Sequence, residues 1–199
     1  MGAPGLIGLT GGIAAGKSEA LAAFERLGAE TLSSDDVVHE LLRNPELRAR
    51  LVERWGDDVA PGGELDRGRI AAIVFADPNE LAWLESELHP LVGQRVVEWA
   101  GRLPEDSRLA VVEVPLLFET HMEDMFDAVV SVVADDEVRR ERAAGMEITS
   151  LEGRSGRQLS QDEKAARATH VIHNDGSLAD LEARVAELVE TLADGGPEG

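Results

Sequence analysis

The sequence contains no cysteine and no tyrosine, and only two of its 199 residues are lysines. Without cysteine the chain can form no disulfide, no thiol nucleophile and no thiolate metal site. Aromatic residues make up 4% of the chain, so we expect a core built mainly from leucine, valine, isoleucine and alanine. No run approaches the roughly 18 apolar residues of a membrane-spanning helix, and no signal-peptide pattern opens the chain. These absences predict a cytoplasmic protein without a membrane partner.

Positive charge is scarce as well. The chain carries 39 acidic and 19 basic residues, which gives a formal net charge of -20. Binding to nucleic acid depends on Lys and Arg side chains that neutralise phosphates, so the composition argues against a nucleic-acid partner. An anionic substrate could bind only where positive charge is concentrated locally. We expect most acidic residues to form a solvated surface, and nothing in the sequence predicts an obligate protein partner.

Short apolar segments alternate with helical patterns along the chain. Five of them predict strands, at residues 6–10, 30–33, 109–114, 128–133 and 170–172. Helices are predicted over residues 17–27 and 177–192, the second with Ser177 and Asp180 as a capping box. This alternation predicts an α/β fold with a parallel central sheet. Ligands bind such sheets beyond the carboxyl ends of the strands.

The turn after the first predicted strand carries the most specific motif. Residues 11–18 read GGIAAGKS and fit the pattern G-x-x-x-x-G-K-[ST]. In such a phosphate-binding loop (P-loop), backbone N–H groups surround phosphate oxygens and the next helix adds its positive dipole end. Lys17 is expected to reach the β- and γ-phosphates, and Ser18 is expected to bind Mg²⁺. We therefore predict a three-layer P-loop NTPase fold with an ATP site at Gly12, Ile13, Ala14, Ala15, Gly16, Lys17, Ser18 and Glu19.

We expect one P-loop domain over residues 1–199, because no linker is long enough to divide it. The expected parts are a nucleotide-binding core (1–36, 105–136 and 165–194), an inserted helical substrate lobe (37–104), a lid (137–164) and a frayed tail (195–199). The lid assignment rests on a polar, arginine-rich composition, since arginines of a lid can close on the triphosphate of ATP.

Five segments, at residues 8–13, 32–35, 88–91, 115–119 and 171–176, together resemble dephospho-CoA kinases. The most specific are the runs HPL and PLLFE, and the likeness extends from about residue 6 to residue 192. The resemblance implies phosphorylation of the ribose 3′-hydroxyl of dephospho-CoA by ATP, giving CoA and ADP in the final step of coenzyme A biosynthesis. It also implies Mg²⁺ as cofactor and the helical lobe as the site of the acceptor, dephospho-CoA.

The resemblance implies roles for single residues. Asp35 is the expected general base and contacts the acceptor, although it could instead cap the following helix. Other expected acceptor contacts are His89, Pro90, Pro115, Leu116, Leu117 and Glu119. His89 could instead be a structural residue at a helix bend, and the two leucines could belong to the core. Glu113 is expected near Mg²⁺, unless it is simply solvated at the end of its strand.

Residues of the lid and of the last strand complete the expected ATP site. Arg154 is expected to be catalytic, because an arginine can stabilise charge on the transferring phosphoryl group. Arg142, Gln158 and Asn174 are expected to contact ATP. The arginines could instead lie on a solvated charged helix without contacting ATP, and Asn174 could be an ordinary turn residue.

The P-loop departs from the family pattern at several positions. Ala14 and Ala15 stand where the family has Gly-Ser, and we expect the cradle to survive if φ at Ala14 is negative. Glu19 stands where the family has Ser or Thr, and Ser33 replaces a first aspartate, which leaves Asp35 as the sole obvious base.

Two other functions are compatible with a P-loop. One is another small P-loop kinase that acts on a nucleoside, a nucleotide or a shikimate-like hydroxyl. The runs HPL and PLLFE argue against this function. The other is a nucleotide-binding switch without transfer activity, which the arginine-rich lid disfavours.

Overall fold

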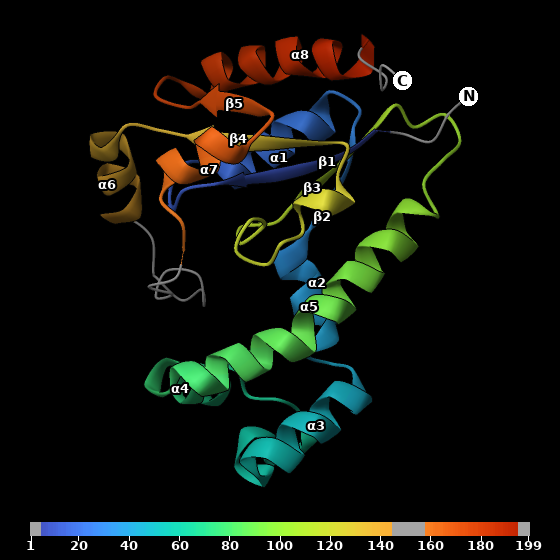
Figure 1. The fold of residues 1–199 in the computed structure, drawn as a ribbon, viewed down its shortest axis with the longest axis vertical. Coiled ribbons are helices and arrows are strands. Elements are labelled where there is room, and N and C mark those ends of the chain that lie inside the picture. The colour runs from blue at the N-terminus through green and yellow to red at the C-terminus, as the bar shows by residue number, and fades with distance from the viewer. Residues whose placement is uncertain (1–4, 145–157, 195–199) are drawn as a thin grey trace. The chain divides into compact units, whose positions relative to one another are not determined.

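The structure is a computed structural model that describes residues 5–144 and 158–194 (Figure 1). The chain forms two compact units, one of residues 1–33 and 99–199 and one of residues 34–98. Within the described ranges, no helix combines the length and the apolar character needed to cross a bilayer.

In the described part of the chain, the first unit is built around a parallel sheet of five strands (Figure 1). The strands are β1 (Gly5–Gly11), β2 (Glu30–Ser33), β3 (Leu109–Glu113), β4 (Ala128–Val133) and β5 (His170–His173). Their order is β2-β3-β1-β4-β5, and each neighbouring pair is parallel. Its helices are α1 (Lys17–Arg26), η3 (Glu123–Met125), α6 (Asp136–Ala144), α7 (Gln161–Arg167) and α8 (Leu178–Asp194). The strands agree with the predicted ones to within a residue at each end, so the predicted α/β fold is confirmed.

One face of the sheet packs against α1 and α8. The buried side chains of this layer include Ile7, Leu9, Phe24, Val111, Val130, Leu181 and Val185. Burying a side chain of this size contributes about 1.5–3 kcal/mol, so this layer is a main source of stability. The predicted capping box precedes α8: Ser177 N donates to the Asp180 carboxylate at 2.8 Å, and Asp180 N donates to Ser177 Oγ at 3.3 Å.

The other face of the sheet is covered by α7 and by the chain that follows β3. A Cβ atom on Gly8 would lie 2.5 Å from the side chain of Leu117, so glycine allows this chain to approach β1 closely. The Thr10 hydroxyl donates to Pro115 O at 3.2 Å. With both faces covered, the sheet is the middle of three layers, as predicted.

The second unit is helical in its described residues. Its elements are α2 (Ser34–Leu41), α3 (Pro45–Trp55), η1 (Asp57–Val59), η2 (Pro61–Gly63), α4 (Arg67–Ala76) and α5 (Pro78–Ala100), which ends just inside the first unit. Asn44 caps α3 by accepting from Glu46 N at 2.7 Å, and Asp66 caps α4 by accepting from Gly68 N at 2.9 Å. The buried residues of this unit include Leu47, Leu51, Val59, Ile70, Val74, Leu84 and Leu88.

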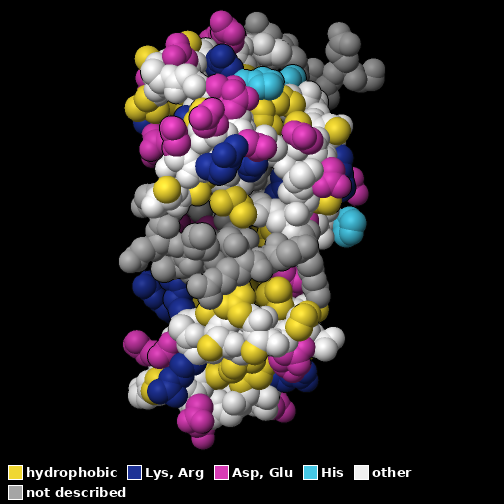
Figure 2. Space-filling model, turned by 90° about the vertical axis from the view of Figure 1, so that its left-hand side faces the viewer, with side chains coloured by type: hydrophobic (Ala, Val, Ile, Leu, Met, Phe, Trp, Pro, Cys, Tyr) yellow, Lys and Arg dark blue, Asp and Glu magenta, His cyan; other side chains and the backbone are white. Residues whose placement is uncertain are grey.

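The surface carries the acidic excess of the sequence. Acidic side chains are spread over the face shown in Figure 2, with arginine and lysine side chains among them. A dispersed distribution of this kind favours solubility, as the net charge of -20 predicts.

Candidate active site

The P-loop joins the end of β1 to the start of α1. Gly11 has a φ of 152°, and a Cβ atom there would lie 2.2 Å from Val132 O in β4. Gly16 has a φ of 95°, and a Cβ atom there would lie 2.1 Å from Nδ2 of Asn174. Only glycine suits these two positions, because each combines a positive φ with a close neighbour.

The condition that the sequence analysis set for Ala14, a negative φ, is not met in the structure. Its φ is 58°, in the left-handed region, where crowding of the Cβ atom costs about 1–2 kcal/mol. Glycine adopts this conformation without that cost. The loop therefore keeps a conformation at Ala14 that favours glycine, although the residue there is alanine.

Lys17 is the first residue of α1 and is 9% exposed. Its Nζ donates to Gly12 O at 3.2 Å, and Ala15 N donates to the same carbonyl at 3.2 Å. The ammonium group thus lies at the loop together with the positive end of the α1 dipole, and both favour an anion. Ser18 and Glu19 follow in the first turn of α1 and are exposed.

Two cavities open beside the P-loop in the first unit. The larger, of about 940 Å³, is lined by Gly12, Ile13, Asp135, Asp136, Glu137, Val138, Arg139, Glu141, Gln158, Leu159, Ser160, Gln161 and Asp162. The smaller, of about 410 Å³, is lined by Ala14, Gly16, Glu19, Arg142, Asn174, Gly176, Leu178 and Leu181. Their volumes suit small-molecule ligands. The structure therefore brings Ile13, Gln158, Arg142 and Asn174 to cavities that border the P-loop.

Asn174 connects the end of β5 to the P-loop. It is 6% exposed, and its Nδ2 donates to Ala15 O at 2.8 Å. Its backbone N–H donates to Val133 O, also at 2.8 Å. An ordinary turn asparagine would not make the contact with Ala15, so Asn174 has a specific part in shaping the loop.

Polar atoms near both cavities lack hydrogen-bond partners within the described ranges. They are Nη1 of Arg142 and Nε of Arg139, both on α6, and both side-chain amide atoms of Gln158, all of them buried. Because buried polar groups are normally hydrogen-bonded, these atoms are suited to contact a bound ligand. Arg154 lies outside the described residues.

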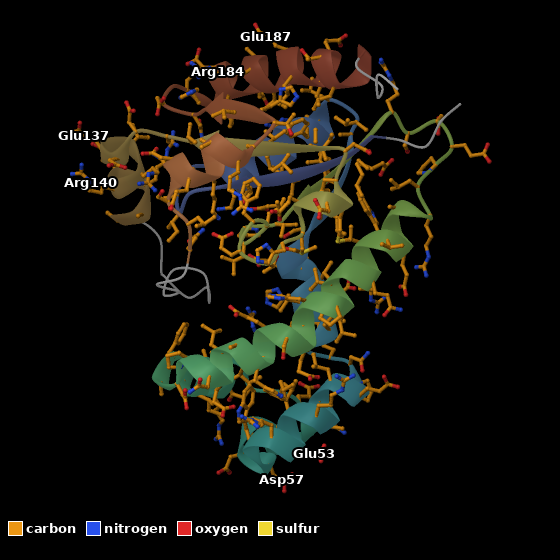
Figure 3. All side chains as sticks on the ribbon, viewed as in Figure 1. Glu53, Asp57, Glu137, Arg140, Arg184 and Glu187 are labelled. Carbon is orange, nitrogen blue, oxygen red and sulfur yellow. The ribbon has the colours of Figure 1, made fainter. Side chains whose placement is uncertain are left out.

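Arg139 was not singled out from the sequence. It lines the larger cavity, and its Nη2 donates to the Asp136 carboxylate at 2.6 Å, which lowers the pKa of Asp136. Arg140 points away from the sheet, as Figure 3 shows. The arginine-rich composition was a signal for this segment, but it could not separate Arg139 from Arg140 without the orientation of α6.

Lys164 was given no role from the sequence either. It is 0% exposed, its Nζ lies 3.1 Å from Glu119 Oε1, and it also donates to Pro115 O. Glu119 Oε1 accepts a further hydrogen bond from Leu159 N at 2.8 Å. These contacts attach α7 and the residues before it to the chain that follows β3.

The chain at the end of β3 contains several predicted site residues. Glu113 is 8% exposed and lies opposite Leu9 in the register of the sheet. Pro115 is buried and Leu116 is half-buried. Leu117 is 0% exposed, which favours the core role that the sequence left open for it.

The remaining predicted residues belong to the second unit. Asp35 is exposed in the first turn of α2, which begins at Ser34, so it does not stand before the helix as a cap. His89 is half-buried inside α5; burial lowers its pKa, and the charge of Glu85 partly opposes this. Pro90 is exposed, and α5 continues through it. The approach of these residues to the P-loop stays a prediction.

No group of three or more His, Asp or Glu side chains is arranged to hold a metal ion among the residues that the structure describes. The oxygen donors that adjoin the P-loop in the chain or in the sheet include the Ser18 hydroxyl and the Glu19 carboxylate on α1 and the Glu113 carboxylate, which ends β3 opposite Leu9 of β1.

Comparison with known proteins points to one family. The family model described as dephospho-CoA kinase matches residues 5–180. The dephospho-CoA kinase of Synechococcus sp. (strain JA-3-3Ab) is 36% identical over 92% of this chain and 91% of its own length. A crystal structure of a Thermus thermophilus protein has a TM-score of 0.78 and 34% identity, covering 96% of this chain and 99% of that one. The dephospho-CoA kinase of Campylobacter jejuni has a TM-score of 0.70 and 25% identity, and the match covers 96% of this chain and 98% of that one.

The match covers the P-loop, the whole second unit and, apart from Leu181, the lining of both cavities beside the P-loop. The resemblance found in the sequence is thereby confirmed, and the expectation of a P-loop kinase with it. This chain belongs to the dephospho-CoA kinase family.

Proposed function

We propose that this protein transfers the γ-phosphoryl group of ATP to the ribose 3′-hydroxyl of dephospho-CoA, giving CoA and ADP in the last step of coenzyme A biosynthesis. The observation that carries the proposal is a P-loop with a nearly buried lysine in a chain that matches this family over residues 5–180. In this reaction the 3′-oxygen attacks the γ-phosphorus in line with the leaving group. The bond between the γ-phosphorus and the oxygen that bridges it to the β-phosphorus breaks, and ADP leaves.

The P-loop supplies the positive field for this step. Lys17 and the backbone N–H groups of residues 12–18 would stabilise the charge that develops on the β- and γ-phosphates. In the structure Lys17 donates to Gly12 O, so it would exchange this carbonyl for phosphate oxygens when ATP binds. Nη1 of Arg142 is buried and has no hydrogen-bond partner among the described residues, and Arg142 lines the smaller cavity, so it would add to that field. Arg154 keeps its proposed catalytic role on the transferring group.

The smaller cavity is the proposed site of the adenine of ATP. Leu178 and Leu181 line it from α8, and Asn174 lines it from the end of β5. An apolar wall with a few polar groups at its edge is the usual lining of a site for a planar base.

Asp35 is the proposed general base. Its carboxylate would accept the proton of the 3′-hydroxyl as the oxygen attacks, and it is exposed at the start of α2, where an acceptor has access. Residues 37–104, with His89 and Pro90, are proposed to bind the acceptor. Residues 137–164 are proposed to act as the lid.

Magnesium is the proposed cofactor. The Ser18 hydroxyl and the Glu113 carboxylate are hard oxygen donors of the kind that Mg²⁺ prefers, and such sites are commonly completed by substrate phosphates and water. These two residues would hold the ion, which when bound neutralises charge on the β- and γ-phosphates. The cytoplasmic location expected from the sequence stays a prediction that cell fractionation would test.

The test is a panel of acceptors with Mg²⁺-ATP, scored by release of ADP. We expect dephospho-CoA to be the preferred acceptor over adenosine, AMP and shikimate. Preference for one of the others would assign the chain to another small-molecule kinase activity. Tight binding of ATP without acceptor-stimulated turnover would instead indicate a nucleotide-binding switch.

A further inference from the structure

The arginines of the second unit fall into two groups. The unit has seven, at positions 43, 48, 50, 54, 67, 69 and 95. Four form ion pairs with carboxylates: Arg50 with Glu87, Arg54 with Glu80, Arg69 with Asp66, and Arg95 with Glu98. The other three, Arg43, Arg48 and Arg67, form no ion pair with a carboxylate in the part of the chain that the structure describes.

These three arginines line one cavity of about 540 Å³. Nη1 of Arg48 donates to Gly63 O at 2.5 Å, and Nη1 of Arg67 contacts Nε2 of His39. Both side chains are thus held at the wall of the cavity by partners that are not carboxylates. Glu64 also lines the cavity, so three guanidinium groups face a single carboxylate there.

The backbone around the cavity adds positive potential. Arg67 is the first residue of α4, and Pro45, the first residue of α3, also lines the cavity. Helix N-termini carry a partial positive charge that favours anions, and the carboxylates of Asp66 at the start of α4 and Glu46 in the first turn of α3 offset part of it here. In a chain with a net charge of -20, this concentration of positive potential stands out as a site for an anion.

We propose that this cavity binds the diphosphate group of the acceptor, a refinement that rests on the function proposed above. Arginine guanidinium groups recognise phosphate oxygens through paired hydrogen bonds, and a diphosphate offers several such oxygens. The phosphates of ATP already have a place at the P-loop in the first unit. The acceptor carries the other diphosphate of the reaction, and the cluster lies in the unit to which acceptor binding is assigned.

The spacing along α2 supports this assignment. His39 follows Asp35 by four residues, so the two lie on one face of α2, about 6 Å apart along the helix axis. The ribose 3′-hydroxyl and the 5′-diphosphate belong to one nucleoside unit of the acceptor and are separated by a few bonds. The cluster therefore begins one helical turn from the base proposed to take the hydroxyl proton.

The experiment compares Arg43→Gln, Arg48→Gln and Arg67→Gln with Arg95→Gln as the control. Arg95 belongs to the same unit and pairs with Glu98, but it does not line the cavity. We expect each cavity variant to raise the KM for dephospho-CoA on the order of 10-fold or more, the effect of losing one charge-assisted hydrogen bond. The KM for ATP should stay unchanged, and Arg95→Gln should behave as the wild type.

Arg43→Gln is the sharpest variant, since Arg43 forms no hydrogen bond or ion pair with another described residue that its loss would break. An unchanged KM for dephospho-CoA in a folded Arg43→Gln protein would overturn the proposal. The proposal would also be overturned if Arg43→Gln raised the KM for ATP and not that for dephospho-CoA, or if Arg95→Gln raised the KM for dephospho-CoA as much as the cavity variants do. If the wild type does not phosphorylate dephospho-CoA at all, the proposed function fails first, which distinguishes the two outcomes.

Discussion

Nδ2 of Asn174 donates a hydrogen bond to the carbonyl oxygen of Ala15 at 2.8 Å, across 159 positions of the sequence. This contact connects the end of β5 to the middle of the P-loop. The Asn174 amide lies so close to Gly16 that a side chain at position 16 would clash with it. Both partners are buried. The conformation of the phosphate-binding loop thus depends on a residue near the other end of the chain.

Replacing Asn174 with alanine should therefore weaken both the fold and ATP binding. The buried Ala15 carbonyl would lose its donor, at a cost of about 1–3 kcal/mol in the free energy of unfolding. We expect the KM for ATP to rise about 5- to 10-fold, which is about 1–1.4 kcal/mol of binding free energy. The control is Asn79→Ala, whose amide donates to Asp77 at an exposed helix start in the second unit. Equal effects of the two variants would contradict this account.

The left-handed conformation of Ala14 predicts an unusual stabilising substitution. Ala14→Gly removes about 1–2 kcal/mol of strain, while the greater freedom of glycine in the unfolded chain takes back about 0.4–1 kcal/mol. We expect a net gain of up to about 1.6 kcal/mol in the free energy of unfolding, measured by denaturant unfolding. Ala15→Gly is the matched control, because Ala15 is 0% exposed and does not have a positive φ, so its replacement should destabilise the protein. Destabilisation by Ala14→Gly to the same extent would show that position 14 is not strained.

The buried pair of Lys164 and Glu119 predicts a large loss of stability. Lys164→Met would leave the Glu119 carboxylate in a largely buried site without its cation, and breaking such pairs costs about 3–5 kcal/mol. The double variant Lys164→Met/Glu119→Gln should recover part of this loss, because no charge is left behind. Arg167→Gln breaks a more exposed pair with Glu123 and should cost less than about 1 kcal/mol. Chemical denaturation of the wild type, Lys164→Met, Glu119→Gln and the double variant measures the coupling, and additive effects of the two single changes in the double variant would refute it.

The burial of His89 predicts how stability depends on pH. Its pKa is lowered from 6.5 in the folded protein, so below about pH 6.5 the unfolded chain binds a proton that the folded one does not. The folded state is therefore favoured fully above about pH 6.5, and this part of the free energy of unfolding is lost as the pH falls from 6.5 towards the lower pKa of His89 in the folded protein. We expect His89→Gln to flatten the stability profile between pH 5 and 7, by at most about 1.4 kcal/mol per pH unit. Profiles of equal slope for wild type and variant would exclude this role.

The elements that could be predicted from sequence are those set by local pattern. The five strands follow from short apolar runs, and the capping box of Ser177 and Asp180 follows from spacing within one helical turn. The P-loop is a contiguous motif, so its position between β1 and α1 could be predicted as well. The positive φ of Ala14 could not be predicted, because the surrounding loop imposes it and alanine itself gives no local sign of it.

The contacts missed from sequence join residues far apart in the chain. Lys164 meets Glu119 and Pro115 across more than 40 positions, and a lysine in a polar helix gives no sign that it will be buried. Arg139 differs from Arg140 only in the face of α6 on which it lies. Arg43 lies in the turn after α2, Arg48 near the start of α3 and Arg67 at the start of α4, and only the fold of the second unit gathers them at one cavity.

The most direct test of the account measures ATP affinity and CoA formation from dephospho-CoA in the wild type, Lys17→Ala and Asp35→Asn. Lys17→Ala should lose ATP affinity and turnover together, because the ammonium group contacts the phosphates in both the bound and the transition state. Asp35→Asn should keep its ATP affinity and lose CoA formation by about 100-fold or more, as expected when a general base is removed. Unimpaired ATP binding and CoA formation in Lys17→Ala would contradict the central claim that the loop between β1 and α1 holds the transferred phosphate.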